Sequence, residues 1–286
     1  MLNAVATAAL AGWYLLRAMV FLLAFAGAGS VWPRIPAGRY RLGLHLALAA
    51  VLGMGWGGLL MLVLGLAGLW NPWLLGAIVV VMLIRGAWFV SRLVAMPGQL
   101  PSAPAVRLSV LEFILIGISA VCAANVTVGA LAPDSAQDSL SYHLSCARAW
   151  VEWGRIIAWP SVWPSNYSVH GSLLYSLLLS FGDGIDCSLL YATQGFLTYA
   201  IAALFAGHWF GRMAAVWTWF LCATAHAANV WFVPINAGSD LTVAMFVTAG
   251  ILLGVDSLFA VSESAGGAGS LSRLLSASLL IGFAAV

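Results

Sequence analysis

Long apolar segments fill most of this chain, and short polar segments separate them. A helix needs about 20 predominantly apolar residues to cross a bilayer. The segments that approach or exceed this length cover residues 4–29, 42–69, 73–90, 108–129, 187–209, 213–233 and 241–259. A further apolar segment, residues 273–286, is too short to cross. Because no alternating strand pattern of about ten residues recurs, we predict an all-α polytopic membrane protein with about seven transmembrane helices and a partial last one.

One polar region interrupts the apolar pattern, between the fourth and fifth predicted helices. Residues 131–170 hold three of the nine acidic residues, namely Asp134, Asp138 and Glu152, and two of the five histidines. Ionisable residues are costly in a membrane protein and are concentrated where they have a function. We therefore expect the chemistry of this chain in an outer loop of about residues 130–186.

An amphipathic helix is predicted over residues 135–154, inside the polar region. Its apolar side chains recur at helical spacing, namely Leu140, Leu144, Ala147 and Val151. Tryptophans cluster beside the polar residues, which is typical of the lipid headgroup layer. We therefore expect a large extracytoplasmic loop with amphipathic juxtamembrane helices on the outer membrane surface.

Charge decides whether the apolar segment 169–181 crosses the membrane. It has only about 13 residues, which is short for a crossing helix. If it crossed, Arg212 and Arg273 would lie outside, against the positive-inside rule. We therefore expect a juxtamembrane or re-entrant helix here. The same rule makes cytoplasmic the basic segments 32–41 and 91–107.

Composition agrees with a membrane protein and narrows its partners. The chain of 286 residues is 63% hydrophobic and 7% charged, whereas soluble domains carry roughly 25% charged residues. The net charge of +2 gives no sign of nucleic-acid binding. Arg17 alone is expected deep in a helix, where it either snorkels to the interface or pairs with Glu112.

The four cysteines have no metal-binding spacing. Cys122 and Cys222 fall in apolar segments and are expected to be packing residues. Cys146 and Cys187 fall in or beside the outer loop, where they are either free thiols or a disulfide.

The motif DSLSYHL at residues 138–144 resembles the D-[SA]-L-x-Y-H-L signature of bacterial GT-C glycosyltransferases. These enzymes are related to protein O-mannosyltransferases and aminoarabinose transferases, and their signature opens the first large extracytoplasmic loop. Relatives usually have proline after this signature, where this chain has Ser145. Further stretches are similar in the same order: Trp150, GRI at 154–156, Pro160, SNY at 165–167, LYSL at 174–177, GHWFGR at 207–212 and DLTVAMF at 240–246.

The resemblance covers about residues 108–260 and implies a division of the chain. Residues 1–107 would be an N-terminal three-helix membrane region, and residues 108–286 a GT-C-like membrane core. Relatives are much longer, so we expect the chain to lack a C-terminal part of such an enzyme.

The reaction that the resemblance implies moves a sugar from a polyprenyl phosphate to an acceptor hydroxyl or amine. It would take place on the extracytoplasmic face of the bacterial inner membrane. A carboxylate suits the base that activates the acceptor, and the family position assigns this role to Asp138. Asp138 also precedes a helical segment, so an N-cap is the alternative or additional role.

Substrate binding is assigned around this base. His143, Arg148 and Arg155 are candidates for the phosphate, which needs positive charge or a metal. Packing for the histidine and solvation for the arginines are the alternatives. Asn166 and Tyr167 are candidates for the sugar, and a turn is the alternative for both. Tyr142 and Asp240 are further candidates for substrate binding. Asp134, Asp138 and Asp240 are weak candidate ligands for a divalent cation such as Mg²⁺ or Mn²⁺.

Two other classes of protein compete with the enzyme. A GT-C-like fold could serve as a non-catalytic structural or assembly subunit of a larger membrane complex. A transporter is less favoured, because transporters place ionisable residues inside their spans. Loss of sugar transfer on Asp138→Asn would distinguish the enzyme from both.

Overall fold

The computed structural model describes residues 2–30, 41–95, 108–135, 137–157, 169–232, 238–263 and 268–285. Within these ranges every regular element is a helix, which confirms the all-α prediction. Six helices contain a stretch long and apolar enough to cross a membrane. They are α1 (Leu2–Gly29), α2 (Arg41–Leu66), α3 (Pro72–Ala95), α4 (Val110–Ala130), α7 (Gly184–Phe210) and α9 (Asp240–Glu263). This architecture is that of a multi-pass membrane protein.

Two more long helices complete the bundle, α8 (Arg212–Phe232) and α10 (Ala268–Ala284). α8 has 21 residues, as many as α4, and corresponds to the predicted segment 213–233. It is not among the six candidate spans found in the described residues, so its crossing and the total of seven stay predictions. α10 has 17 residues and matches the predicted partial last helix.

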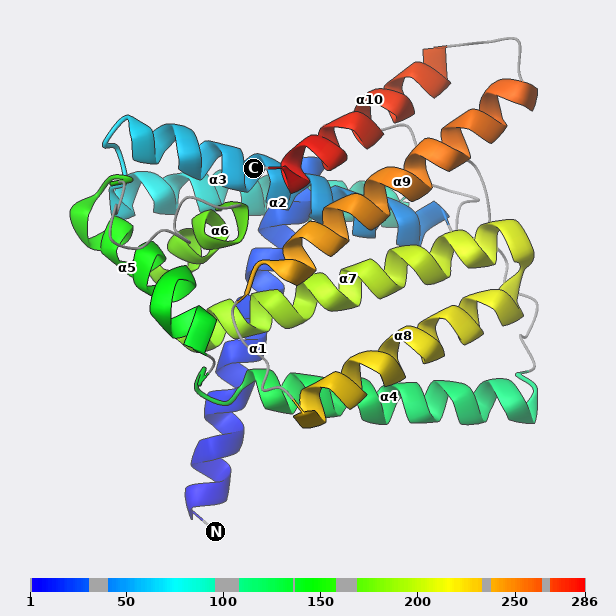
Figure 1. Cartoon of the computed structure of the whole chain (residues 1–286), viewed down its shortest axis with the longest axis horizontal. Helices are drawn as coiled ribbons and strands as arrows, with labels where there is room; N and C mark the ends of the chain where they lie inside the picture. The colour runs from blue at the N-terminus through cyan, green and yellow to red at the C-terminus, as the bar shows by residue number, and fades with distance from the viewer. Residues whose placement is uncertain are drawn as a thin grey trace.

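The helices form two groups (Figure 1). α10, α9, α7, α8 and α4 lie side by side in that order. α1, α2 and α3 pack together and meet the first group through contacts of α1 and α2 with α7. This grouping accords with a separate three-helix region over residues 1–107, whose standing as a domain stays a prediction.

α1 runs steeply across the other helices and approaches two of them at backbone distance (Figure 1). A Cβ atom at Gly27 would clash with the carbonyl oxygen of Met82 on α3. A Cβ atom at Gly53 on α2 would clash with the carbonyl oxygen of Phe25. Small residues allow such contacts between membrane helices. The glycines therefore let α1 pack directly on the backbones of α2 and α3.

The chain does not cross the bundle between α4 and α7. α6 (His170–Leu179) has ten residues, and residues 170–178 are all buried. α4 ends and α7 begins at the same end of the bundle, which also holds the π-helix η1 (Ser139–His143) and α5 (Leu144–Trp153) (Figure 1). We call this end the loop end. The structure agrees with a chain that turns back at the loop end. Whether residues 169–181 cross a membrane, and which side of it the loop end faces, stay predictions.

Among the described residues, three carboxylates are buried in the helices, namely Glu112, Asp186 and Asp256. Glu112 accepts two hydrogen bonds, of 2.6 and 2.7 Å, from Arg212. Arg17 instead pairs with Asp186 at 3.0 Å, which rules out the pairing of Arg17 with Glu112. The third carboxylate, Asp256, is also ion-paired. An unpaired charge is costly in this setting, and the fold supplies each partner from another helix.

Candidate functional site

Asp138 lies at the loop end, immediately before η1. Its backbone is helical, with φ −64° and ψ −41°, and its side chain makes no capping hydrogen bond. An N-cap residue has an extended backbone and accepts a bond from an amide two or three residues on. The N-cap interpretation is therefore wrong. The residue is exposed, which leaves its carboxylate open to a substrate.

The π-turn of η1 changes which side chains share a helix face. Its hydrogen bonds join residues five apart, as from the Leu144 amide to the Ser139 carbonyl oxygen, so the turn is wider than an α-turn. Leu140 was expected on the same apolar face as Ala147, yet Leu140 is 53% exposed and Ala147 is fully buried. α5 therefore forms the C-terminal part of the predicted helix, and Leu140 lies outside α5, in η1.

His143, at the end of η1, is buried with 6% of its surface exposed. Its Nδ1 atom lies 3.2 Å from the hydroxyl oxygen of Ser172 on α6. Its ring centroid lies 4.3 Å from that of Tyr142. Burial lowers the pKa of His143 below its ordinary value, and nearby carboxylates offset only part of this effect. The imidazole is therefore neutral at pH 7 and can act through hydrogen bonds, not as a cation.

Three carboxylates act on His143, namely Asp138, Asp240 and Asp134, in order of decreasing effect. Asp240 is the first residue of α9 and is exposed. Burial, and then the charges of Asp138 and Asp240, raise the pKa of Tyr142, so its phenol stays protonated. The structure thus brings Asp138, Tyr142, His143 and Asp240 to one place, from segments far apart in the sequence.

Hydrogen bonds to α6 and α7 fix the start of α9, and with it Asp240. The Tyr175 hydroxyl on α6 donates to the carbonyl oxygen of Gly238 at 2.5 Å. The Thr242 hydroxyl donates to Oε1 of Gln194 on α7 at 2.8 Å. Both bonds lie within two residues of Asp240. The family resemblance pointed to Asp240, but no local pattern identified the residues that hold it.

α5 is fastened at its C-terminal end to the turn between α2 and α3. Gly154 has a φ of 66°, a left-handed conformation that suits glycine at the end of a helix. Its carbonyl oxygen accepts from the Trp70 amide at 3.1 Å, and the Ile156 amide donates to the Gly65 carbonyl oxygen at 3.0 Å. Arg155 lies between these bonds and is exposed. It is thus one α5 length, about 15 Å, from η1.

Arg148 faces a separate cleft of about 350 Å³ at the loop end. Neither Asp138 nor His143 lines this cleft, so Arg148 faces a different side of the η1–α5 segment. The residues that shape the cleft include Asp134, Leu140, Leu144, Arg148, Asp183 and Ile185.

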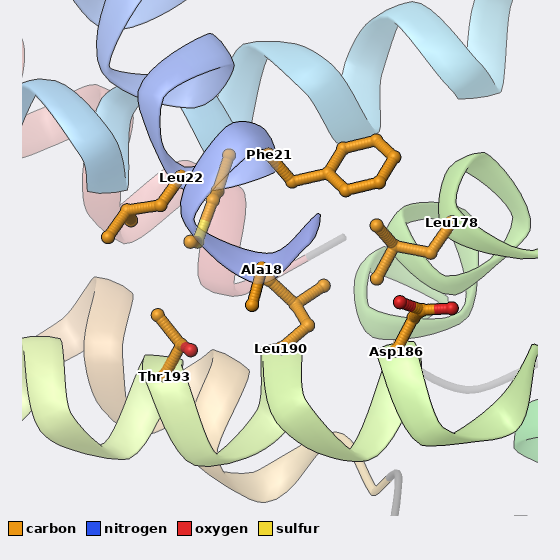
Figure 2. Close-up of a pocket in the computed structure, with 8 residues that line it drawn as sticks. Ala18, Phe21, Leu22, Leu178, Asp186, Leu190 and Thr193 are labelled. Atoms are coloured by element: carbon orange, nitrogen blue, oxygen red, sulfur yellow. The ribbon is translucent and has the colours of Figure 1, made fainter. Parts of the chain in front are cut away.

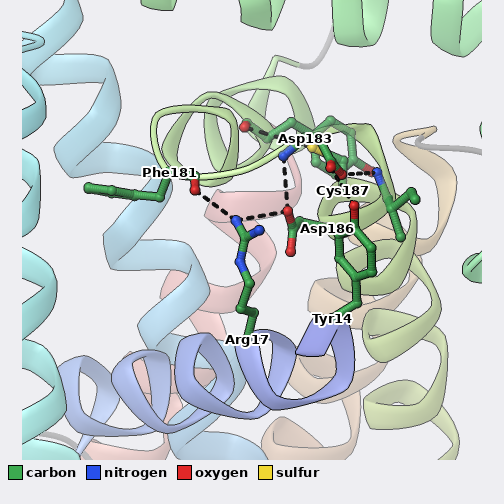
Figure 3. Close-up of polar contacts among 8 residues, drawn as sticks. Tyr14, Arg17, Phe181, Asp183, Asp186 and Cys187 are labelled. Carbon is green, nitrogen blue, oxygen red and sulfur yellow. Dashed lines mark hydrogen bonds and ion pairs between the residues drawn. The ribbon is translucent and has the colours of Figure 1, made fainter. Parts of the chain in front are cut away.

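A polar cluster that the sequence did not reveal lies beside this cleft (Figure 3). Arg17 donates to the carbonyl oxygen of Phe181 at 2.8 Å and pairs with Asp186. The Tyr14 hydroxyl donates to Asp183 at 2.6 Å. Asp183 and Asp186 form the capping box of α7. Two acids three residues apart before an apolar segment were a signal for this cap, but nothing in the sequence assigned α1 as their partner.

A small cavity lies between α1 and α7 (Figure 2). Its walls are mostly apolar, with the Asp186 carboxylate among them. Its volume is about 10 Å³, and a cavity needs about 10–15 Å³ to hold one water molecule. This cavity is therefore too small for a substrate, and the candidate site remains at the exposed face of η1.

Other predicted groups have mixed outcomes. All four cysteines are free thiols, so a Cys146–Cys187 disulfide is wrong. The Cys187 thiol lies instead 3.9 Å from the carbonyl oxygen of Tyr175. In the described part of the chain, no three His, Cys, Asp or Glu side chains are arranged to hold a metal ion. The divalent cation therefore stays a prediction without support. Asn166 and Tyr167 lie outside the described residues.

Comparisons with family models, with curated proteins and with solved structures found no match to this chain. The likeness to GT-C glycosyltransferases therefore depends on its motifs alone. What the protein does must be inferred from the chemistry and placement of its own residues.

Proposed function

We propose that this protein is a membrane glycosyltransferase of the GT-C type, which moves a sugar from a polyprenyl phosphate to an acceptor at the loop end. One observation carries the proposal. The exposed carboxylate of Asp138 makes no capping bond, and it lies beside the buried His143 and near Asp240. In a chain with 7% charged residues, such a group at the end of the bundle favours chemistry over packing.

Asp138 would act as the general base. It would take the proton of the acceptor hydroxyl or amine while the acceptor oxygen or nitrogen bonds to the anomeric carbon of the sugar. The bond from that carbon to the phosphate oxygen breaks, and the polyprenyl phosphate leaves with the electron pair. The transition state has oxocarbenium character. The exposure of Asp138 gives the acceptor room to approach within hydrogen-bond distance.

Tyr142, His143 and Asp240 would hold the sugar. The raised pKa of Tyr142 keeps its phenol a hydrogen-bond donor. Because Ser172 contacts Nδ1 of His143, the other ring nitrogen is the one left for the substrate. Asp240 would accept hydrogen bonds from sugar hydroxyls.

The leaving phosphate is assigned to Arg148 and Arg155, both of which are exposed. The neutral His143 could add a hydrogen bond to the phosphate but no charge. Arg148 lies on another face of the η1–α5 segment than Asp138, and Arg155 lies at the far end of this segment. A donor that contacts both arginines and Asp138 would therefore have to wrap around the segment. A bound Mg²⁺ or Mn²⁺ would supply the same charge.

The bilayer explains why such a site would be built on this bundle. The apolar helices keep the polyprenyl tail in the membrane, while the loop end is where α4 stops and α7 and α9 start. Lipid headgroups lie at such helix ends. We assign the loop end to the extracytoplasmic face of the bacterial inner membrane, following the arginine distribution.

The test uses purified protein in proteoliposomes with polyprenyl phosphates that carry radiolabelled hexoses or pentoses. Released polyprenyl phosphate is quantified with and without a membrane lipid extract as the acceptor. We expect Asp138→Asn to lower the release by about 100-fold or more, the contribution of a general base. Glu152→Gln is the matched control, because Glu152 is an exposed acid of α5.

The opposite result has a clear meaning. If no donor in the panel is turned over and the chain co-purifies with a larger complex that tolerates Asp138→Asn, the proposal is wrong. The protein would then be a non-catalytic subunit.

A further inference from the structure

The cleft that Arg148 faces combines opposite charges with apolar walls. Arg148 is exposed, and no ion pair or hydrogen bond joins it to another described residue. Two carboxylates, Asp134 and Asp183, line the same cleft. Its apolar walls come from η1, α5, α6 and α7, and include Leu140, Leu144, Leu179 and Ile185. A ligand must therefore match a cation, two anions and hydrocarbon together.

The negative charge of Asp183 is not neutralised by its hydrogen bonds. Oδ2 accepts from the Tyr14 hydroxyl at 2.6 Å, and Oδ1 accepts from the Ile185 amide at 2.9 Å. Both donors are neutral groups. Arg17 pairs with Asp186 and not with Asp183. A simple anion in the cleft would meet Asp183 and Asp134, and a simple cation would meet Arg148, so neither matches all the charged groups that line the cleft.

A zwitterion matches charges of both signs. A phosphate would meet the guanidinium of Arg148, which binds phosphate oxygens in a bidentate manner. A primary ammonium group has three N–H donors, which carboxylates accept. A quaternary ammonium group has none of these donors.

The place and size of the cleft select a lipid. It lies beside the first turn of α7, at the end of a candidate membrane span, where headgroups lie. Its volume of about 350 Å³ is in the range of small-molecule sites and suits a headgroup with the start of its chains. The leucine and isoleucine walls would contact those chains.

We propose that this cleft binds a zwitterionic phospholipid with a primary ammonium headgroup, of the phosphatidylethanolamine class. Arg148 holds the phosphate, and Asp134 and Asp183 hold the ammonium. Neither Asp138 nor His143 lines this cleft, which shares Arg148 with the candidate site for the donor phosphate. The inference does not depend on glycosyl transfer.

The test measures lipid retention. The full chain is purified from vesicles of equal parts phosphatidylethanolamine, phosphatidylcholine and phosphatidylglycerol, washed in detergent, and analysed by native mass spectrometry. We expect phosphatidylethanolamine to be retained at least tenfold over either other lipid. Arg148→Gln and Asp134→Asn should each remove this preference, whereas Arg155→Gln should keep it because Arg155 does not line the cleft.

Three results would overturn the proposal. Equal retention of phosphatidylglycerol would indicate a site for anions alone. Equal retention of phosphatidylcholine would show that the ammonium N–H groups are not recognised. Retention by Arg148→Gln equal to that by Arg155→Gln would place the lipid elsewhere. Both arginines are exposed, so neither variant should fail to fold, and thermal unfolding of each variant checks this.

Discussion

The ion pair between Arg17 and Asp186 gives the sharpest prediction about stability. The Asp186 side chain is 3% exposed, that of Arg17 is 17% exposed, and their charged atoms lie 3.0 Å apart. Removal of one partner of a buried pair costs about 3–5 kcal/mol, because the other charge stays buried without compensation. Asp186 keeps a hydrogen bond from the Asp183 amide at 3.0 Å, so the lower value applies. We therefore expect Arg17→Gln to lower the free energy of unfolding by about 3 kcal/mol.

A double-mutant cycle separates this pairing from other effects of the changes. Asp186→Asn should cost less, about 2 kcal/mol, because Arg17 keeps its bond to the Phe181 carbonyl oxygen. The double variant Arg17→Gln/Asp186→Asn should be more stable than the sum of the single effects predicts, by about 1.5 kcal/mol or more.

The assay is reversible unfolding in mixed micelles, followed by the fluorescence of the 14 tryptophans. Arg148→Gln is the matched control, because this exposed arginine has no ion pair in the described residues, and it should change the unfolding free energy by less than about 0.5 kcal/mol. Additive single effects, within about 0.5 kcal/mol, would refute the pairing.

Two further predictions concern pH and topology. Because the pKa of His143 is lowered in the folded state, the unfolded chain binds its proton first as the pH falls. Stability should therefore drop progressively below about pH 6.5. Thermal unfolding of His143→Gln should show a smaller drop in stability over this pH range than the wild type. An equal drop in the variant and the wild type would contradict the role of His143. For topology, a cysteine in place of Met213, introduced in a background without native cysteines, should be labelled from the side opposite to one in place of Ser141. Labelling of both from the same side by an impermeant maleimide would show that the chain crosses between α4 and α7.

The helices and the fold-back of the chain were predictable from the sequence. Apolar length alone located the spans, because the bilayer sets a minimum helix length. The positions of Arg212 and Arg273 also indicated that residues 169–181 do not cross. Apolar length is a property of a single segment, and the distribution of arginines is a property of the sequence as a whole. Both can be read from the sequence without knowledge of how the helices pack.

The partners of the buried charges were not predictable. Glu112 is joined to Arg212, and Arg17 to Asp186, across about 100 and 170 residues of sequence. Such pairs depend on how the helices pack, and helix packing leaves no local pattern. The pairing of Arg17 with Glu112 failed for this reason.

The details of the candidate site show the same limit. The resemblance located Asp138 and Asp240, and the structure brings both near His143. The π-turn of η1 escaped prediction, because apolar spacing assumes 3.6 residues per turn. In the structure Leu140 is exposed and Asp138 has no capping role. The contact of His143 with Ser172 joins two elements that no motif links.

The most direct test of the proposed function compares Asp138→Asn with Glu152→Gln in the same proteoliposomes, on a donor that the wild-type protein turns over. The measured quantity is the initial rate of polyprenyl phosphate release per folded protein, with the folded fraction taken from thermal unfolding. We expect a rate for Asp138→Asn about 100-fold or more below that for Glu152→Gln, and the rate for Glu152→Gln should match the wild type. Equal rates for the two variants would show that the exposed carboxylate beside His143 has no part in the reaction.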